Sequence, residues 1–202
     1  MPARVLGTLI AACLLLPLPA ALGSGGVVAP TPEQPEAAAF GDRVLRVGMS
    51  GADVRVLNVL VRSKPYAPAV RLSTAFETPT RDGVRLFQER RGLRASGVVN
   101  EATADELVRT MGRARATWYG PGLYGNTTAC GRVLRAGTVG LAHRTLPCGT
   151  VVAIAYRGRF LVTKVIDRGP YHRGYTWDLT NGARRLLGFE GVGELRHAVA
   201  RR

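Results

Sequence analysis

The sequence predicts an α+β protein in which a small helical domain precedes a small β-barrel. Between Asp42 and Thr110, apolar residues recur at helical spacing and capping residues separate the segments. From Ala116 onward the pattern changes to short apolar runs, rich in β-branched residues and separated by glycine-rich turns. Many short strands with such turns are typical of a small barrel. The 202 residues are enough for two domains of this size.

The first residues have the pattern of a secretory signal peptide. Arg4 precedes an apolar run from Val5 to Leu16, and prolines and small residues follow. We predict a signal peptide over residues 1–23 and a protein that is secreted, either extracellular or associated with the cell wall. The run is too short to span a bilayer comfortably. The competing interpretation is a lipobox that would lipidate Cys13, and the apolar run that continues past Cys13 argues against it.

Composition limits the partners of the protein. The net charge is +14, which favours a polyanionic partner such as an anionic wall polymer. The basic residues are scattered, without a basic helix or an aromatic platform, so we predict no nucleic-acid binding. Residues 24–41 are rich in Gly, Pro and Ala, and they predict a flexible linker.

Three short helices are predicted between residues 42 and 112. Ser50 and Asp53 form the pattern of a capping box for the first helix. The pair Thr78-Pro79 opens the second helix, and Gly92 ends it. Asn100 caps the third.

This helical segment resembles the three-helix peptidoglycan-binding domain found on many wall hydrolases. The stretches LRVGMSGADVRVLNVLV, FETPTRDGVRLFQERRGL and SGVVNEATADEL carry the resemblance in order and spacing. The chain departs from the usual pattern at Ser73-Thr74-Ala75, where Asp-Gly-Val is common, and at Glu77, where Gly is common. The resemblance implies the glycan strands of peptidoglycan as partner.

The barrel is predicted over residues 113–202, after a short basic linker from Gly112 to Arg115. Val151–Tyr156 and Phe160–Ile166 predict a hairpin. Thr180 is placed to cap a short helix that Gly188 ends, and a closing strand follows near Leu195.

Two aspartates stand where apolar segments end in the stretch VTKVIDRGPYHRGYTWDLT. Asp167 follows the run Val165-Ile166 and precedes a turn, and Asp178 interrupts a second apolar run. Two carboxylates in one cleft perform acid–base chemistry on sugars. The competing interpretation is that Asp167 caps the turn and Asp178 starts the following helix.

Two cysteines remain once the signal peptide is removed. An even pair in an exported protein predicts a disulfide between Cys130 and Cys148. The alternative is a catalytic thiol, but no partner motif accompanies either residue.

Four motifs from Ala116 to about Val199 resemble the rare lipoprotein A (RlpA-like) domain. They are ATWYGPGLYGNTTACG, LAHRTLPCGT, VIDRGPYHRG and WDLTNGARRLLG. The resemblance implies a six-stranded double-psi β-barrel, related to expansins, with a groove for a sugar polymer. It also implies lytic transglycosylation of peptidoglycan, in which the residues at Asp167 and His143 take part. In expansins the residues at Asp167 and Asp178 matter for wall loosening.

One departure affects the predicted activity. Catalytically competent members carry a glutamate after the T-A-x-G motif, where this chain has Arg132. A guanidinium cannot act as an acid or base at neutral pH. A non-catalytic, expansin-like wall-loosening protein and a module that docks a hydrolase therefore stay open as alternatives.

The predicted catalytic residues are Asp167 as acid and base, with Asp178 or His143 assisting. For His143, a histidine satisfied in the barrel core is an equally good interpretation. The predicted substrate-binding residues are four aromatic side chains and one arginine: Trp118, Tyr119, Tyr124, Arg168 and Tyr171. His172 and His197 lack the spacing of metal ligands, so we predict no metal site. We also predict that the protein has no cofactor and is a monomer.

Overall fold

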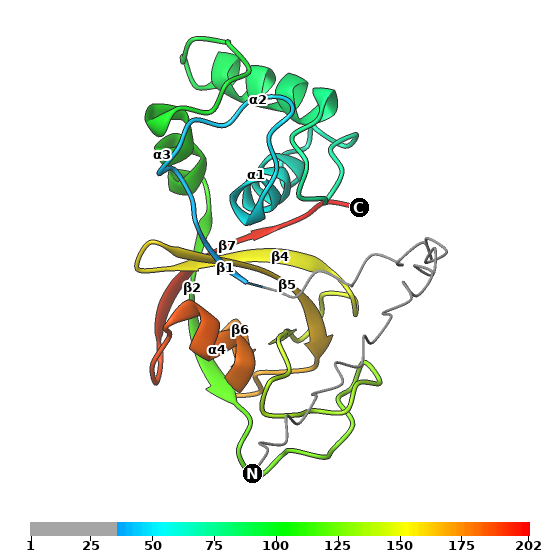
Figure 1. Cartoon of the computed structure of the whole chain (residues 1–202). Helices are drawn as coiled ribbons and strands as arrows, with labels where there is room; N and C mark the ends of the chain where they lie inside the picture. Colours follow the sequence, from blue (N-terminus) through cyan, green and yellow to red (C-terminus); the bar gives the residue numbers. More distant parts are fainter. Residues whose placement is uncertain (1–35) are drawn as a thin grey trace, which may run out of the picture. The chain divides into compact units, whose positions relative to one another are not determined.

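The computed structural model describes residues 36–202, which form a helical part and a β-barrel (Figure 1). The predicted signal peptide, Cys13 and most of the predicted linker lie outside these residues. Within residues 36–202 no helix has the length and apolar character needed to cross a membrane.

The three predicted helices are confirmed as α1 (Ala52–Arg62), α2 (Thr78–Arg90) and α3 (Glu101–Arg109). α2 begins with a proline in its first turn, where the missing N–H costs nothing. At α3 the side chain of Asn100 accepts a hydrogen bond from the amide of Thr103 at 3.0 Å, as its sequence position predicts.

The predicted capping box at α1 is wrong. The N-cap is Gly51, whose φ of 146° suits a residue without a side chain, and no side chain caps the helix. Asp53 instead binds Arg43 through two hydrogen bonds of 2.6 and 2.8 Å. The guanidinium competes successfully for the carboxylate because it offers two parallel, charge-assisted donors.

Six strands of the described chain close into the predicted barrel. Their order around the barrel is β5-β3-β6-β2-β7-β4, and β4 pairs back to β5. The pairs β2–β6 and β3–β5 are parallel, and the other pairs are antiparallel. The bounds are β2 Gly112–Tyr119, β3 Leu141–Ala142, β4 Val151–Tyr156, β5 Arg159–Asp167, β6 Trp177–Thr180 and β7 Gly193–Val199.

Two segments predicted to be linkers belong to strands. Within the predicted linker 24–41, Ala37–Ala39 form β1, which pairs with β5 at its free edge. The next residue, Phe40, is buried and packs edge-on against Phe160 at 5.6 Å, which holds this segment in place. Gly112–Arg115 are the first half of β2, where the ladder to β7 orders them.

Strands β4 and β5 have buried side chains on both faces, and each face contributes to a different hydrophobic core. In β4, Val152 and Ile154 point into the barrel, whereas Ala153 and Ala155 point out and join the core of the helical part. β5 alternates in the same way. The helical part therefore packs directly on the outer face of the barrel, with α1 against β4, β5 and β7 (Figure 1).

The remaining predicted helix is confirmed as α4 (Asn181–Leu187). The hydroxyl of Thr180 caps its first turn, accepting from the amide of Ala183 at 3.2 Å. Gly188 ends the helix in the left-handed region, with φ of 66°. This cap fixes α4 directly after β6, so that the helix starts beside the strand that carries Asp178.

Candidate functional site

The barrel brings the two predicted aspartates to either side of one short strand. Asp167 ends β5 and Asp178 lies in β6, and both pair with Ala142 of β3. Neighbouring strands lie about 4.8 Å apart, so one strand separates the two backbones. The register of β3 shifts at this point, which lets Ala142 face both aspartates.

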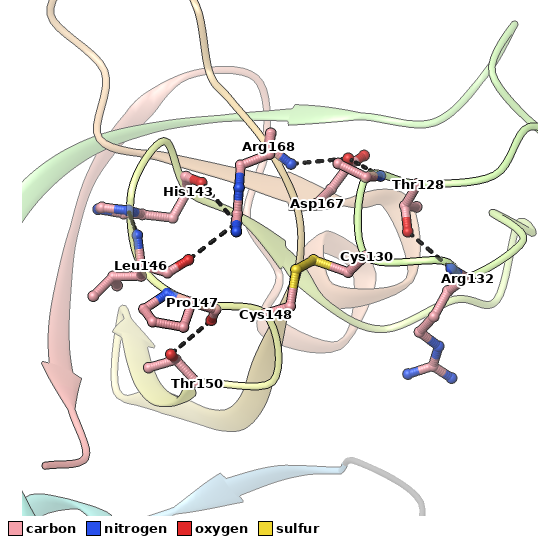
Figure 2. Close-up of a disulfide and its surroundings, with 11 residues drawn as sticks. Thr128, Cys130, Arg132, His143, Leu146, Pro147, Cys148, Thr150, Asp167 and Arg168 are labelled. Carbon is pink, nitrogen blue, oxygen red and sulfur yellow. Dashed lines mark hydrogen bonds between the residues drawn. A yellow bond between two sulfur atoms is a disulfide. The ribbon is translucent and has the colours of Figure 1, made fainter. Parts of the chain in front are cut away.

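Backbone amides hold the carboxylate of Asp167. Its Oδ1 accepts from the amide of Ala129 and from the amide of Arg168, both at 2.8 Å (Figure 2). Ala129 belongs to the loop between β2 and β3, so this loop is tied to the end of β5 through the carboxylate.

Asp178 has the opposite environment. Its Oδ1 is buried and has no hydrogen-bond partner in the part of the chain that the structure describes. Burial, followed by the negative charge of Asp167, raises the pKa of Asp178 to about 6. Asp178 is therefore the carboxyl group of the pair that keeps its proton closer to neutral pH.

Tyr119 completes this cluster from β2. Its strand runs parallel to β6, with Thr117 opposite Asp178 and Tyr119 opposite Thr180. The hydroxyl is buried and has no hydrogen-bond partner among residues 36–202. Burial, and then the charges of Asp167 and Asp178, raise the pKa of Tyr119 far above its ordinary value, so it remains a neutral phenol.

The ring of His143 lies apart from the carboxylate of Asp167 (Figure 2). It packs on Trp177 with ring centroids 4.7 Å apart, against the barrel core. Its Nδ1 accepts from the amides of Thr145 and Leu146 at 3.2 and 3.0 Å, which places the proton of the neutral ring on Nε2. Burial, Arg144 and Arg168 lower the pKa of His143. In Figure 2 the ring and the Asp167 carboxylate lie on opposite sides of Arg168.

The predicted substrate-binding residues divide into three environments. Trp118 and Tyr124 lie next to the start of α4, as described below. The guanidinium of Arg168 binds the carbonyl of Leu146 at 3.0 Å, and so it braces the loop after β3. The side chain of Tyr171 is 81% exposed.

Two site residues escaped the sequence prediction. The guanidinium of Arg184 lies 4.4 Å from the ring centroid of Trp118 and also binds Asn181 Oδ1. Asn181 in turn donates to the hydroxyl of Tyr124 at 2.9 Å. These four side chains form a polar and aromatic ledge beside β6. The signal was the position of α4 in the sequence, because this helix directly follows the strand that carries Asp178.

The predicted disulfide between Cys130 and Cys148 is confirmed. It joins the loop that carries Ala129 to the segment before β4 (Figure 2). Arg132 lies two residues further along this loop, and its amide binds Thr128 Oγ1 at 3.2 Å. Its guanidinium points away from Asp167 in Figure 2. Within residues 36–202, no three His, Cys, Asp or Glu side chains gather as a metal site requires.

Sequence comparison agrees with both parts of the fold. A family profile described as "Lytic transglycolase" matches residues 112–198, and one described as "Putative peptidoglycan binding domain" matches residues 50–107. A protein from Synechocystis sp. named "Probable endolytic peptidoglycan transglycosylase RlpA" is 37% identical over 97 residues. The chain carries an RlpA-like double-psi β-barrel behind a peptidoglycan-binding domain.

The RlpA-like relatives are longer than this chain. The match to the Synechocystis protein covers 47% of this chain and 30% of that protein. The "Endolytic peptidoglycan transglycosylase RlpA" of Pseudomonas aeruginosa is 32% identical over 103 residues, which are 50% of this chain and 29% of that one. The chain therefore spans less than a third of the length of these relatives. A crystal structure of an apo expansin from Clavibacter michiganensis matches at 26% identity with a TM-score of 0.36, over 44% of this chain and 50% of the expansin.

Proposed function

We propose that this chain binds peptidoglycan and cleaves its glycan strands as a lytic transglycosylase, at the site formed by Asp167 and Asp178 with Tyr119 beside them. The observation that carries the proposal is the carboxyl pair across β3, in which Asp178 keeps its proton to about pH 6. Relatives named peptidoglycan transglycosylases, aligned over about half of the chain, support the same reaction.

Lytic transglycosylation needs one group that first gives and then takes a proton. Asp178 donates its proton to the glycosidic oxygen, and the bond from that oxygen to C1 of N-acetylmuramic acid breaks. The C6 hydroxyl oxygen of the same sugar then bonds to C1, and its proton passes to Asp178. The product is a 1,6-anhydro sugar, and no water is consumed. A raised pKa suits Asp178 to this exchange.

Asp167 has a complementary task in this proposal. Its carboxyl group, held by two amides, lies where it can stabilise the positive charge that develops at C1. The sequence alone favoured Asp167 as the acid and base, with Asp178 assisting. The environments favour the reverse assignment, because Asp167 Oδ1 accepts two amide hydrogen bonds, whereas Asp178 Oδ1 is buried, accepts none within residues 36–202 and belongs to the carboxyl group with the raised pKa. His143 packs behind this pair, and a direct role for it stays a prediction.

The helical domain supplies the attachment to the wall, and the protein acts outside the cytoplasm as a secreted protein. With a net charge of +14, binding to anionic wall polymers should add to glycan binding. Sedimentation of the full chain with purified sacculi should therefore weaken between 50 and 500 mM salt, on the order of several-fold. Binding that is indifferent to salt would remove the anionic polymers from the proposal.

The decisive experiment is incubation of the purified chain with sacculi, followed by mass analysis for 1,6-anhydro muropeptides. Wild-type protein should release them, and Asp178→Asn and Asp167→Asn should not, because an amide neither shuttles a proton nor carries a charge. Asp105→Asn, an exposed aspartate on α3, is the matched control and should retain full activity. Product formation that survives in Asp178→Asn would contradict the assignment.

Arg132 favours a second candidate, a non-catalytic expansin-like module that loosens the wall by binding glycan. It replaces the glutamate that catalytic members carry at this position. In that case the wild type releases no anhydro product, yet Asp167→Asn and Asp178→Asn still weaken glycan binding in the sedimentation assay. The two candidates thus differ in a wild-type measurement.

A further inference from the structure

We propose that a cavity between the helical part and the barrel binds an oxyanion group, phosphate or carboxylate, of an anionic wall polymer. The cavity has a volume of about 280 Å³ and is lined by residues of α3, β2, the hairpin of β4 and β5, and β7. None of these lining residues belongs to the site around Asp167 and Asp178. The inference rests on the proposed function for its place in the wall and deepens it, and its test needs no turnover.

Three arginines line this cavity from three different elements. Arg113 lies on β2, Arg157 in the turn between β4 and β5, and Arg196 on β7. Glu194 of β7 is the acidic residue of the lining, so positive charge is in excess. A guanidinium presents paired N–H donors that match the oxygens of a phosphate or a carboxylate. The lining therefore has the chemistry of an oxyanion site.

Two of these guanidinium groups keep donors for a ligand. In the described chain Arg196 gives a single side-chain hydrogen bond, to a carbonyl of α3 at 3.3 Å, which leaves its other N–H groups available. Arg113 pairs with Glu194 at 3.1 Å, and these side chains are 60% and 55% exposed. An ion pair as exposed as this one contributes little to stability. A competing anion can therefore engage both arginines.

Arg157, the third arginine, has a backbone conformation that its side chain does not favour. It is the one non-glycine residue with a positive φ among residues 36–202, at 47°, and Gly158 follows at 78°. Two-residue hairpin turns with positive φ at both positions prefer Asn or Asp before the glycine. The Arg157 side chain makes no hydrogen bond or ion pair within the described residues, and its guanidinium lies 5.1 Å from the ring centroid of Tyr156. An arginine that strains the turn without a bonded partner is expected where the cation serves a ligand.

The rest of the lining suits the carbon units that join successive anions in a polymer. Val108, Ala155 and Phe160 contribute apolar surface, and Ala155 and Phe160 are buried. The C–H groups of a polyol or a sugar can pack there while the oxyanion meets the arginines. A cavity of about 280 Å³ lies just below the range of typical small-molecule sites, so it holds one repeating unit rather than a long segment.

The test is calorimetric titration of the full chain with a glycerol phosphate oligomer and with an oligoglucuronate, at about 150 mM salt. The informative variant is Arg157→Asn, because asparagine suits the left-handed turn and removes the cation. Its melting temperature should equal or exceed that of the wild type. Its affinity for the bound oligomer should fall about tenfold, as expected for the loss of charge-assisted hydrogen bonds. The oligomer that the wild type binds more tightly identifies the oxyanion as phosphodiester or carboxylate.

Two further variants separate a specific site from the general attraction of a basic protein. Arg157→Lys keeps the net charge but lacks the paired donors, so it should weaken binding by about threefold, less than Arg157→Asn does. Arg94→Asn removes the same charge at an exposed position of the helical part, outside the cavity lining. It should leave the affinity within about twofold of the wild type, because salt screens distant charges.

Three results would overturn the proposal. They are binding of the wild type to neither oligomer, unchanged affinity in a folded Arg157→Asn, and equal weakening by Arg157→Asn and Arg94→Asn. If phosphatidylglycerol vesicles bind through Arg157 and neither oligomer does, the cavity faces a membrane surface and the polymer is excluded. If the wild type releases no anhydro product, the proposed catalytic function fails, while the titration still decides the role of the cavity.

Discussion

The amide of Ala129 donates a hydrogen bond of 2.8 Å to Asp167 Oδ1, and the residue after Ala129 is one half of the disulfide. The bridge from Cys130 to Cys148 therefore fixes the loop that supplies a donor to the site. A structural cross-link and a functional carboxylate are connected through one peptide unit. This connection makes the disulfide a determinant of the site as well as of stability.

Replacing Cys130 and Cys148 together by serine should lower both stability and activity. Opening a loop of this length costs about 3 kcal/mol in the chain-entropy description. Release of anhydro product should fall by more than the loss of folded protein explains, because the Ala129 amide is no longer held at Asp167. Thermal denaturation and product analysis of the same sample separate the two effects. Unchanged specific activity of the folded fraction would show that the bridge has no influence on the site.

The sequence predicted the elements well because their signals are local. Asn100 and Thr180 cap the helices they were expected to cap, and the hairpin of β4 and β5 follows from two short apolar runs. The errors came from partners distant in the chain. Asp53 binds Arg43 and the amide of Val54 rather than completing a capping box with Ser50, and Ala37–Ala39 gain a strand partner in β5 that their composition does not indicate.

In the candidate site, too, local features could be predicted from the sequence and contacts between distant parts of the chain could not. The sequence indicated that Asp167 and Asp178 meet, but it could not indicate how the environments of their two carboxyl groups differ. That difference depends on two backbone amides, one of them from Ala129, and on the burial of one oxygen atom. Backbone donors carry no side-chain signature, and Tyr119 looked like any aromatic residue at a strand end.

Asp178→Asn should stabilise the protein above pH 6. Folded Asp178 keeps its proton to about pH 6, whereas the unfolded residue keeps it only to its ordinary value of 3.8. The folded state thus binds more protons between these values, and wild-type stability falls as pH rises through this window. Asparagine lacks this effect. We expect a gain of about 1 kcal/mol at pH 8, less than the shift alone implies because solvent screens a half-buried carboxyl.

The measurement is denaturant unfolding of both proteins at pH 3 and pH 8. The gain should vanish at pH 3, where Asp178 is protonated in both states of the wild type. Asp105→Asn, on the exposed face of α3, should show no such pH-dependent difference. An equal gain at both pH values would point to a packing effect rather than to titration.

Ala153→Arg should destabilise the helical part and the barrel together. Ala153 is fully buried on the outer face of β4, in the same apolar cluster as the core of the helical part. An unpaired guanidinium in that position should cost about 3 kcal/mol or more. Val192→Arg, at a position 57% exposed, is the control and should be neutral.

Two spectroscopic probes report separately on the two parts of this protein: tryptophan fluorescence on the barrel and circular dichroism on the helices. Both tryptophans, Trp118 and Trp177, lie in the barrel, and most of the helix signal in circular dichroism comes from α1, α2 and α3. The two probes should give coincident transitions that shift together in Ala153→Arg. Transitions that separate would mean that each part folds alone.

The last prediction concerns Arg132, which the resemblance to the RlpA-like domain places where catalytic members carry a glutamate. Its loop is ordered by a turn in which the amide of Thr128 binds the carbonyl of residue 132 at 2.7 Å, so a new side chain starts from a fixed backbone. The guanidinium is exposed, and removing it should cost little stability. Arg132→Glu should increase the release of anhydro product, because it replaces a cation beside the groove with a group that can exchange protons.

Two further variants identify the cause of any gain. Arg132→Gln removes the cation without adding a carboxyl group, and Arg135→Glu makes the same change of charge at a neighbouring exposed position. A gain in Arg132→Glu alone means that the carboxyl group takes part in the reaction. A gain shared with Arg132→Gln means that the cation weakens binding of the substrate or of the transition state. A gain shared with Arg135→Glu means that the change in net charge, rather than the position of the carboxyl group, causes the gain. Wild-type release equal to that of all three variants would show that Arg132 is no barrier to turnover and that the pair formed by Asp167 and Asp178 is sufficient.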